Sequence, residues 1–179
     1  PLFLDLARGV QLETQEQWKS ALDHYQSVLA RDDSLRFAVD GLARSTRRDE
    51  LDRELQDYLD RPDRLVAPAV RAAAQRAQAR GESTTVPKAR LGSQLRELRA
   101  RLDALEVKVP VEISSDGSTL VFVATVGELG VFAHREFELP PGQYTVIGRR
   151  EGYRDVRREL AIMPGQQRVS LSIQCTERI

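Results

Sequence analysis

The residues of this chain best suited to chemistry are cationic and aromatic, and they cluster between positions 149 and 158. Arginine and tyrosine are favoured at the centres of protein interfaces, and arginine also recognises polyanions. The candidate partner-binding residues are Arg149, Arg150, Tyr153, Arg154 and Arg157. A second interpretation stays open, in which these arginines pair with Glu151, Asp155 and Glu159 on the exposed face of a strand.

Motifs for catalysis are missing from the sequence. It has no phosphate loop of the G-x-x-x-x-G-K type, no G-x-S-x-G, no H-E-x-x-H and no dinucleotide fingerprint. The two histidines, His24 and His134, lie in different predicted domains, so a metal site would need carboxylates brought in by the fold. Cys175 is the only cysteine, which excludes an internal disulfide and a cysteine-based metal site. We therefore expect no enzymatic activity, no cofactor and no metal.

Carboxylates in the middle of the chain have arginines beside them. The acidic residues are Asp49, Glu50, Asp52 and Glu54. Arg47, Arg48 and Arg53 around them predict ion pairs along a helix face, each worth about 0.3 to 0.5 kcal/mol. Arg71, Arg76 and Arg80 form a further stripe, which is either solvated or a contact for an acidic partner.

The composition is that of a folded protein, with 41% hydrophobic and 30% charged residues among 179. Acidic and basic side chains balance at 18 each in residues 1–106 and at 9 each in residues 107–179. Neither half has the basic excess that binding to a nucleic-acid backbone requires. The longest uncharged apolar run, residues 119–127, is about half of the roughly 20 residues that a membrane-spanning helix needs.

The spacing of apolar residues changes once along the chain. It is helical from residue 3 to about residue 105 and alternates from residue 107 onward. This change predicts an α+β protein, with an α-helical domain over residues 1–106 and a β-sandwich over residues 107–179. The first two helices, over residues 3–13 and 17–30, are expected to form a hairpin.

Several residues of this hairpin have the types and spacing of a known helical repeat. They are Gly9, Leu12, Ala21, Tyr25, Val28 and Leu29. In this respect the hairpin resembles one tetratricopeptide repeat, in which small residues let two antiparallel helices pack closely around an aromatic side chain. Asp5, Arg8 and Asp33 depart from that pattern, so it indicates a single degenerate repeat. The resemblance implies a helical scaffold whose groove holds a protein partner.

The rest of the helical half has clear boundaries. Ser34 is the candidate N-cap of a third helix. Helical spacing continues into the charged stretch of residues 44–64, in which Pro62 is expected to end the helix. Another helix is expected to begin near Pro68 and to stop at a loop over residues 81–87.

The final helix carries leucines that step by four and three residues, which is an a/d seam of two heptads. These leucines are Leu91, Leu95, Leu98, Leu102 and Leu105. The seam either seals the last groove of the helical domain or mediates self-association.

Six strands with tight turns between them are predicted in the second half, and they indicate a small antiparallel sandwich. They cover residues 107–113, 119–125, 131–139, 144–147, 154–162 and 169–173. Pro110 predicts that the first strand lies at a sheet edge, because proline cannot donate to a ladder.

Residues 139–153 read Leu-Pro-Pro-Gly-Gln-Tyr-Thr-Val-Ile-Gly-Arg-Arg-Glu-Gly-Tyr. Pro141 suits the second position of a turn, and Gly142 suits the positive φ that follows. The segment resembles the "L-x-P-G-x-Y-x-V" strand and "G-Y" turn of the PEGA domain, a compact β-sandwich of bacterial envelope and surface proteins. The resemblance covers residues 109–173 and implies a binding or spacer module without chemistry of its own.

These observations predict a non-enzymatic protein–protein interaction scaffold of the bacterial cell envelope or periplasm. The chain begins Pro-Leu-Phe without Met, so we expect an anchoring or signal segment upstream. That segment would anchor this chain, and its partner would be a protein, with a membrane-anchored protein as one candidate. Two alternatives are a peptidoglycan- or glycan-binding module and an accessory subunit of an energised inner-membrane complex.

Overall fold

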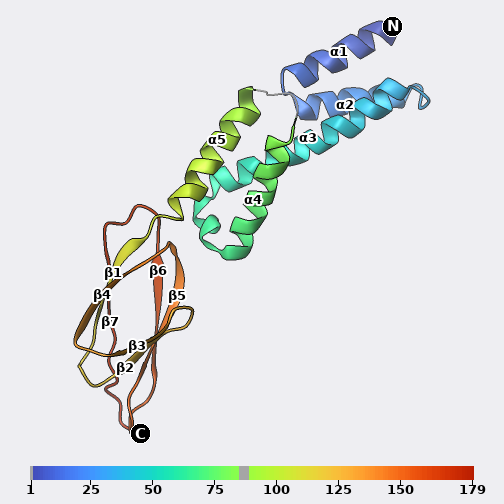
Figure 1. Ribbon diagram of the computed structural model, residues 1–179. Coiled ribbons are helices and arrows are strands. Elements are labelled where there is room, and N and C mark those ends of the chain that lie inside the picture. The colour runs from blue at the N-terminus through green and yellow to red at the C-terminus, as the bar shows by residue number, and fades with distance from the viewer. Residues whose placement is uncertain (1, 85–88) are drawn as a thin grey trace. The chain divides into compact units, whose positions relative to one another are not determined.

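Helices occupy the first part of the chain and strands the second, as the sequence predicts (Figure 1). The computed structural model describes residues 2–84 and 89–179, and within them it has five α-helices, one 3-10 helix and seven strands. One compact unit comprises the residues up to Arg61 together with Ala72–Arg99, and the other comprises Pro62–Arg71 with Ala100–Ile179. No helix of the described residues is long and apolar enough to cross a membrane.

The helical unit begins with the predicted hairpin. Helices α1 (Leu2–Thr14) and α2 (Trp18–Leu29) match their expected ranges within one residue at each end. Helix α3 (Arg36–Asp60) packs against both of them. The apolar faces of the three helices meet in one core, formed by Leu12, Ala21, Tyr25, Val28 and Ala38.

Tyr25 lies at the centre of this core, and its side chain is fully buried. Its ring lies between Gly9 of α1 and Gly41 of α3, where a Cβ on either glycine would come within 2.4 Å of the ring carbon Cζ. The hydroxyl donates a hydrogen bond to Oε1 of Glu13, at 3.0 Å. Two glycines without side chains therefore let three helices close around one aromatic ring.

The start of α3 corrects one prediction, because Ser34 is not its N-cap. The N-cap position belongs to Leu35, which makes no side-chain capping bond. The hydroxyl of Ser34 instead donates to Oδ1 of Asp32, at 2.6 Å. The end of α3 agrees with the prediction, since Pro62 follows it and opens the 3-10 helix η1 (Pro62–Val66).

Helix α4 (Pro68–Glu82) begins at the predicted proline but does not stop at Gly81. Gly81 is buried within the helix, and a Cβ there would lie 2.7 Å from Cδ2 of Leu95. This glycine therefore serves the close approach of α5 (Ala89–Ala104). Positions 85–87 of the predicted loop lie outside the described residues.

The N-terminus of α5 is capped from a distant part of the chain. The carboxylate of Glu16 accepts hydrogen bonds from the backbone N–H groups of Arg90 (2.9 Å) and Leu91 (3.2 Å). The backbone N–H groups in the first turn of a helix have no acceptor within that helix, so the Glu16 carboxylate satisfies two of them. Its negative charge is also favourable beside the positive end of the helix dipole.

The leucine seam of α5 is mostly covered by the chain itself. Leu91, Leu98 and Leu102 are buried, and Leu95 is partly buried. The seam therefore acts as the predicted internal seal, and this burial leaves little of it open for self-association.

The strands form two sheets that share one core. The three-stranded sheet has the order β4 (His134–Leu139), β1 (Val109–Ser114) and β7 (Val169–Ser172). The four-stranded sheet has the order β3 (Gly127–Val131), β2 (Leu120–Val123), β5 (Gly142–Arg149) and β6 (Val156–Ile162). Fully buried residues of both sheets meet between them, among them Ile113, Val121, Val123, Val146 and Ile162. All pairings are antiparallel except that of β1 with β7, which is parallel.

Two predictions for the strands are wrong. Strand β1 is the centre of its sheet and not an edge. Pro110 is tolerated there because β7 pairs with β1 only from Val111 onward, so Pro110 has a neighbouring strand on one side only. Residues 127–130, which the sequence indicates as a turn, begin β3, and the predicted strand over 131–139 is interrupted between Val131 and His134.

The turn before β5 is held by a tyrosine and not by an unusual glycine backbone. Gly142 does not have the predicted positive φ, whereas Gly152, which closes the same motif, does, at 77°. Tyr144 folds back so that its hydroxyl donates to the carbonyl oxygen of Pro140, at 2.7 Å. A Cβ on Gly142 would lie 3.1 Å from the Tyr144 ring, so this glycine provides space for the ring.

Candidate functional site

The structure places the predicted partner-binding residues around the β5–β6 turn, but it does not gather them on one free surface. Arg149 ends β5, where its guanidinium lies 5.3 Å from the centre of the Phe122 ring and its Nε lies 3.1 Å from Oδ2 of Asp155. Arg157 lies in β6 opposite Ile147 and is exposed. Among the described residues Arg157 has no ion-pair partner.

Two of the predicted residues, Tyr153 and Arg154, hold the C-terminal tail, residues 174–179, against the turn, whereas Arg150 pairs with Asp116, with 3.4 Å between Nη1 and Oδ2. The guanidinium group of Arg178 in the tail lies 5.7 Å from the centre of the Tyr153 ring, and that of Arg150 lies 4.3 Å from it. Arg154 pairs with Glu177, with 3.2 Å between Nη1 and Oε1. Backbone hydrogen bonds add to this attachment, from Arg154 N–H to Glu177 O and from Ile179 N–H to Gly152 O. Of the carboxylates that the pairing interpretation names, only Asp155 is used, by Arg149; Arg150 and Arg154 pair instead with Asp116 and with Glu177 of the tail.

We expect Tyr153→Ala to loosen this tail. Loss of the ring removes the cation–π contact with Arg178, worth about 0.5 to 1 kcal/mol at exposed sites, and the hydrogen bond that Nε of Arg178 donates to the Tyr153 hydroxyl, worth about 1 kcal/mol. Hydrogen exchange of the amides in residues 174–179 should accelerate roughly tenfold, which mass spectrometry of C-terminal peptides measures. Arg157→Ala is the matched control and should leave this exchange unchanged; equal acceleration in both variants would contradict the assignment.

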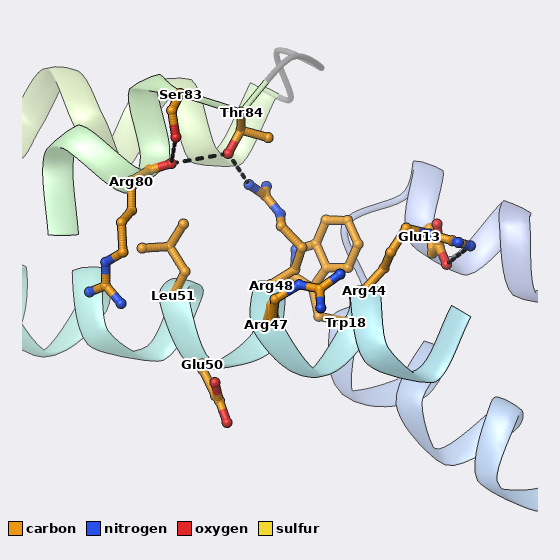
Figure 2. Close-up of a pocket in the computed structure, with 10 residues that line it drawn as sticks. All are labelled: Glu13, Trp18, Arg44, Arg47, Arg48, Glu50, Leu51, Arg80, Ser83 and Thr84. Carbon is orange, nitrogen blue, oxygen red and sulfur yellow. Dashed lines mark hydrogen bonds and ion pairs between the residues drawn. The ribbon is translucent and has the colours of Figure 1, made fainter. Parts of the chain in front are cut away.

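A second cationic site, which the sequence did not single out, lies in the helical unit. It is a pocket of about 610 Å³ between α1, α2, α3 and the end of α4 (Figure 2). We name it the arginine groove, and its principal lining residues are Trp18, Arg44, Arg47, Arg48, Leu51 and Arg80. Three of the arginines and Leu51 come from one face of α3, at the spacing i, i+3, i+4 and i+7.

Two of the groove's arginines are neutralised by carboxylates. Arg44 lies 3.1 Å from Oε1 of Glu13, the same oxygen that accepts the Tyr25 hydroxyl. Partial burial opposes the charge of Arg44, but the hydrogen bond and charge of Glu13 hold its pKa above the ordinary value. Arg80 of α4 forms an ion pair with Glu54 of α3.

Arg48 has no such partner. Its guanidinium lies 4.8 Å from the centre of the Trp18 ring, and Nη1 donates only a long hydrogen bond, 3.4 Å, to Oγ1 of Thr84. Within the part of the chain that the structure describes, no carboxylate lies within ion-pair distance of Arg48 or of its exposed neighbour Arg47. Partial burial lowers the pKa of Arg48, an effect that the more distant charges of Glu16 and Asp52 offset only in part.

Those two carboxylates are committed to α5. Glu16 accepts the first-turn N–H groups of that helix, and Asp52 pairs with Arg90, with 2.8 Å between Oδ2 and Nη2. Of the ion pairs predicted along α3, the one between Arg53 and Asp49 is present, at 2.7 Å. The prediction was wrong for Arg47 and Arg48. The i, i+3, i+4, i+7 spacing on α3 was the signal in the sequence that could have identified the groove.

The stripe of arginines predicted on α4 is also divided between different partners. Arg80 contributes to the groove, while Arg71 lies in the other compact unit and pairs with Glu106, at 3.8 Å. The stripe is therefore not one continuous contact surface.

The two histidines and the cysteine contact neighbouring elements of the fold. Nε2 of His24 lies 2.8 Å from the carbonyl oxygen of Asp5, which joins α2 to α1. His134 lies on β4 beside Glu112 and Glu136, at 3.4 and 3.6 Å. Cys175 is buried, and its backbone N–H donates to Oγ1 of Thr119. No group of three or more metal-ligating side chains occurs among the described residues.

The arginine groove thus combines uncommitted guanidinium groups with an aromatic wall and an aliphatic side chain. Guanidinium groups donate hydrogen bonds and remain charged at any physiological pH, so the arrangement suits binding of an anionic group and not proton transfer. Comparisons of the sequence with protein-family models and with curated proteins found no match.

Proposed function

We propose that this chain is a non-enzymatic protein-binding scaffold and that the arginine groove holds a segment of the partner protein. The observation that carries the proposal is a pocket of about 610 Å³ in which Arg48 is partly buried and, among the described residues, has no ion-pair partner. A pocket of this volume accommodates a few side chains.

The walls of the groove are preorganised, which supports a binding role. Glu13 joins α1, α2 and α3 through its bonds to Tyr25 and Arg44. The Tyr25 ring fills the space between Gly9 and Gly41. A rigid site loses less conformational entropy when a ligand binds. This close packing around Tyr25 also supports the resemblance to a tetratricopeptide repeat, which forms part of the proposal.

In this proposal the strand-rich unit is a second contact or a spacer, as its resemblance to the PEGA domain implies. Location in the bacterial cell envelope rests on the same resemblance. Because Tyr153 and Arg154 hold the C-terminal tail and Arg150 pairs with Asp116, Arg149 and Arg157 are the predicted contact residues that remain. Replacing both by Glu should weaken recovery of the partner only if this unit contacts it.

The glycan-binding alternative receives less support. Sugar rings stack on open aromatic faces, but two guanidinium groups, those of Arg150 and Arg178, lie 4.3 and 5.7 Å from the centre of the Tyr153 ring. Trp18, the only tryptophan, is buried and carries Arg48 over its ring. Sedimentation with purified peptidoglycan tests this alternative. Co-sedimentation that is the same for the wild-type chain and for variants with substituted groove arginines would favour it.

Site-specific crosslinking tests the protein-binding proposal. A photoreactive amino acid at Ser83, an exposed residue of the groove, should form adducts with a defined protein in envelope extracts, and the same group at exposed Arg99 of α5 should not. Excess unlabelled wild-type chain should suppress the adduct, whereas a chain with Arg47→Trp, which fills the rim, should not. Equal adducts at both positions, or none at Ser83, would overturn the proposal.

A further inference from the structure

The charges of the arginine groove do not balance within the chain. Of its four arginines, Arg44 and Arg80 are paired with Glu13 and Glu54. Arg47 and Arg48 are not paired within the described residues. Glu50 also borders the groove, but Figure 2 shows its side chain pointing to the opposite side of α3 from Leu51. The groove therefore carries two cationic groups without a counter-charge.

The fold commits the carboxylates that act on Arg48 to another helix. Removing a guanidinium from water is costly unless an anion compensates it. The carboxylates that act on Arg48 from a distance, Glu16 and Asp52, are held by α5 through the backbone of Arg90 and Leu91 and the side chain of Arg90. Among the described residues, the carboxylates that act on Arg48 are therefore committed elsewhere, and an anionic ligand would supply a closer compensating charge.

Arg48 is also positioned to receive an anion. The Trp18 ring supports one face of its guanidinium, and Oγ1 of Thr84 contacts one nitrogen. The remaining N–H groups of a guanidinium form a planar fork that matches both oxygens of a carboxylate. Trp18 and Leu51 supply apolar surface beside this fork.

We propose that the ligand of the arginine groove is an acidic segment of the partner protein, whose side-chain carboxylates bind Arg48 and Arg47. This inference rests on the proposed function and names the chemistry of its ligand. Two uncommitted cations match one or two carboxylates. Nucleic acids and anionic membranes instead require an extended basic surface, and the chain has no net charge.

The direct test measures fluorescence anisotropy of two short labelled peptides with the full chain at low salt. One peptide alternates Glu with Ala, and the other has Gln at each Glu. We expect the Glu peptide to bind at least about tenfold more tightly, because hydrogen bonds between charged groups are worth roughly 1.5 to 3 kcal/mol. Rising salt should weaken its binding. Equal binding of the two peptides would overturn the inference.

Substitutions locate the effect. Arg48→Gln and Arg47→Gln should each weaken the Glu peptide about tenfold and leave the Gln peptide unchanged. Arg47 is exposed, so its variant keeps the test valid if Arg48→Gln does not fold. Arg158→Gln removes the same charge from an exposed strand residue and should have no effect. An equal loss in Arg158→Gln, or tighter Arg48-dependent binding of a DNA oligonucleotide or of phosphatidylglycerol vesicles, would reject the acidic segment as ligand.

The two proposals fail in different ways. If the Ser83 adduct forms and persists with Arg48→Gln while the two peptides bind equally, the groove binds protein but not through carboxylates, and only this inference is overturned. If no adduct forms at Ser83, the protein-binding proposal fails. In that case, tighter binding of the Glu peptide than of the Gln peptide would show that the groove binds anions but does not bind the partner protein.

Discussion

Gly41→Ala is expected to lower the free energy of unfolding by about 1 to 2 kcal/mol. A Cβ at this position would lie 2.4 Å from Cζ of Tyr25 and 2.6 Å from two further ring carbons. The ring cannot move aside, because Gly9 lies against it and Glu13 holds the hydroxyl. Overpacking a tight core typically costs about 1 to 3 kcal/mol or more, which exceeds the gain of about 1 kcal/mol in helix propensity when Ala replaces Gly.

Gly92→Ala is the matched control for this prediction. Gly92 also lies within a helix, but the nearest atom to its added Cβ is Nη1 of the flexible Arg96 side chain, 3.4 Å away. This variant should be more stable than wild type by up to about 1 kcal/mol. Urea unfolding followed by circular dichroism measures both changes. Stabilisation by Gly41→Ala would show that the Tyr25 ring is not confined between the helices.

Alkaline pH is expected to destabilise the helical unit through Tyr25. Burial, the hydrogen bond to Glu13 and the charge of Glu13 raise the pKa of Tyr25 from 10.0 to about 12. The folded state therefore holds the phenolic proton more tightly than the unfolded state does. This contribution to stability is complete below pH 10 and is lost as the pH rises through about 12. The loss between pH 9 and pH 12 should be about 2 kcal/mol.

Tyr25→Phe isolates this contribution, since other titrating groups remain in both proteins. The variant should be about 1 kcal/mol less stable at neutral pH, because Glu13 loses one hydrogen-bond donor. Its stability should decline less steeply between pH 10 and pH 12. Urea unfolding of both proteins across this range provides the comparison, and identical declines would exclude Tyr25 as the source.

Elements with a local cause were predictable from the sequence. Helical spacing located α1 and α2 within one residue, and prolines marked the end of α3 and the start of α4. Alternation located most strands, because successive side chains of a strand face opposite sides. The fold class depends only on such patterns, and it was predicted correctly.

The neighbours of each strand were less predictable. Pro110 indicated an edge strand, yet β1 is central, because the parallel pairing with β7 begins only at Val111. That pairing joins segments more than fifty residues apart, so no local pattern reveals it. The same limit applies to β3, where Gly127–Val131 becomes a strand because β2 pairs with it.

The sequence by itself determined the two kinds of secondary structure, their order along the chain, and the presence of arginines in both the helical and the strand-rich part. Only the tertiary structure decided which arginines are free. Tyr153 and Arg154 are engaged because the C-terminal tail returns to the β5–β6 turn. Among the described residues Arg48 has no ion-pair partner, and Glu16 instead accepts a hydrogen bond at the start of α5, 74 residues along the chain. Ion pairing depends on distance in space, which the fold sets through contacts that sequence spacing does not encode.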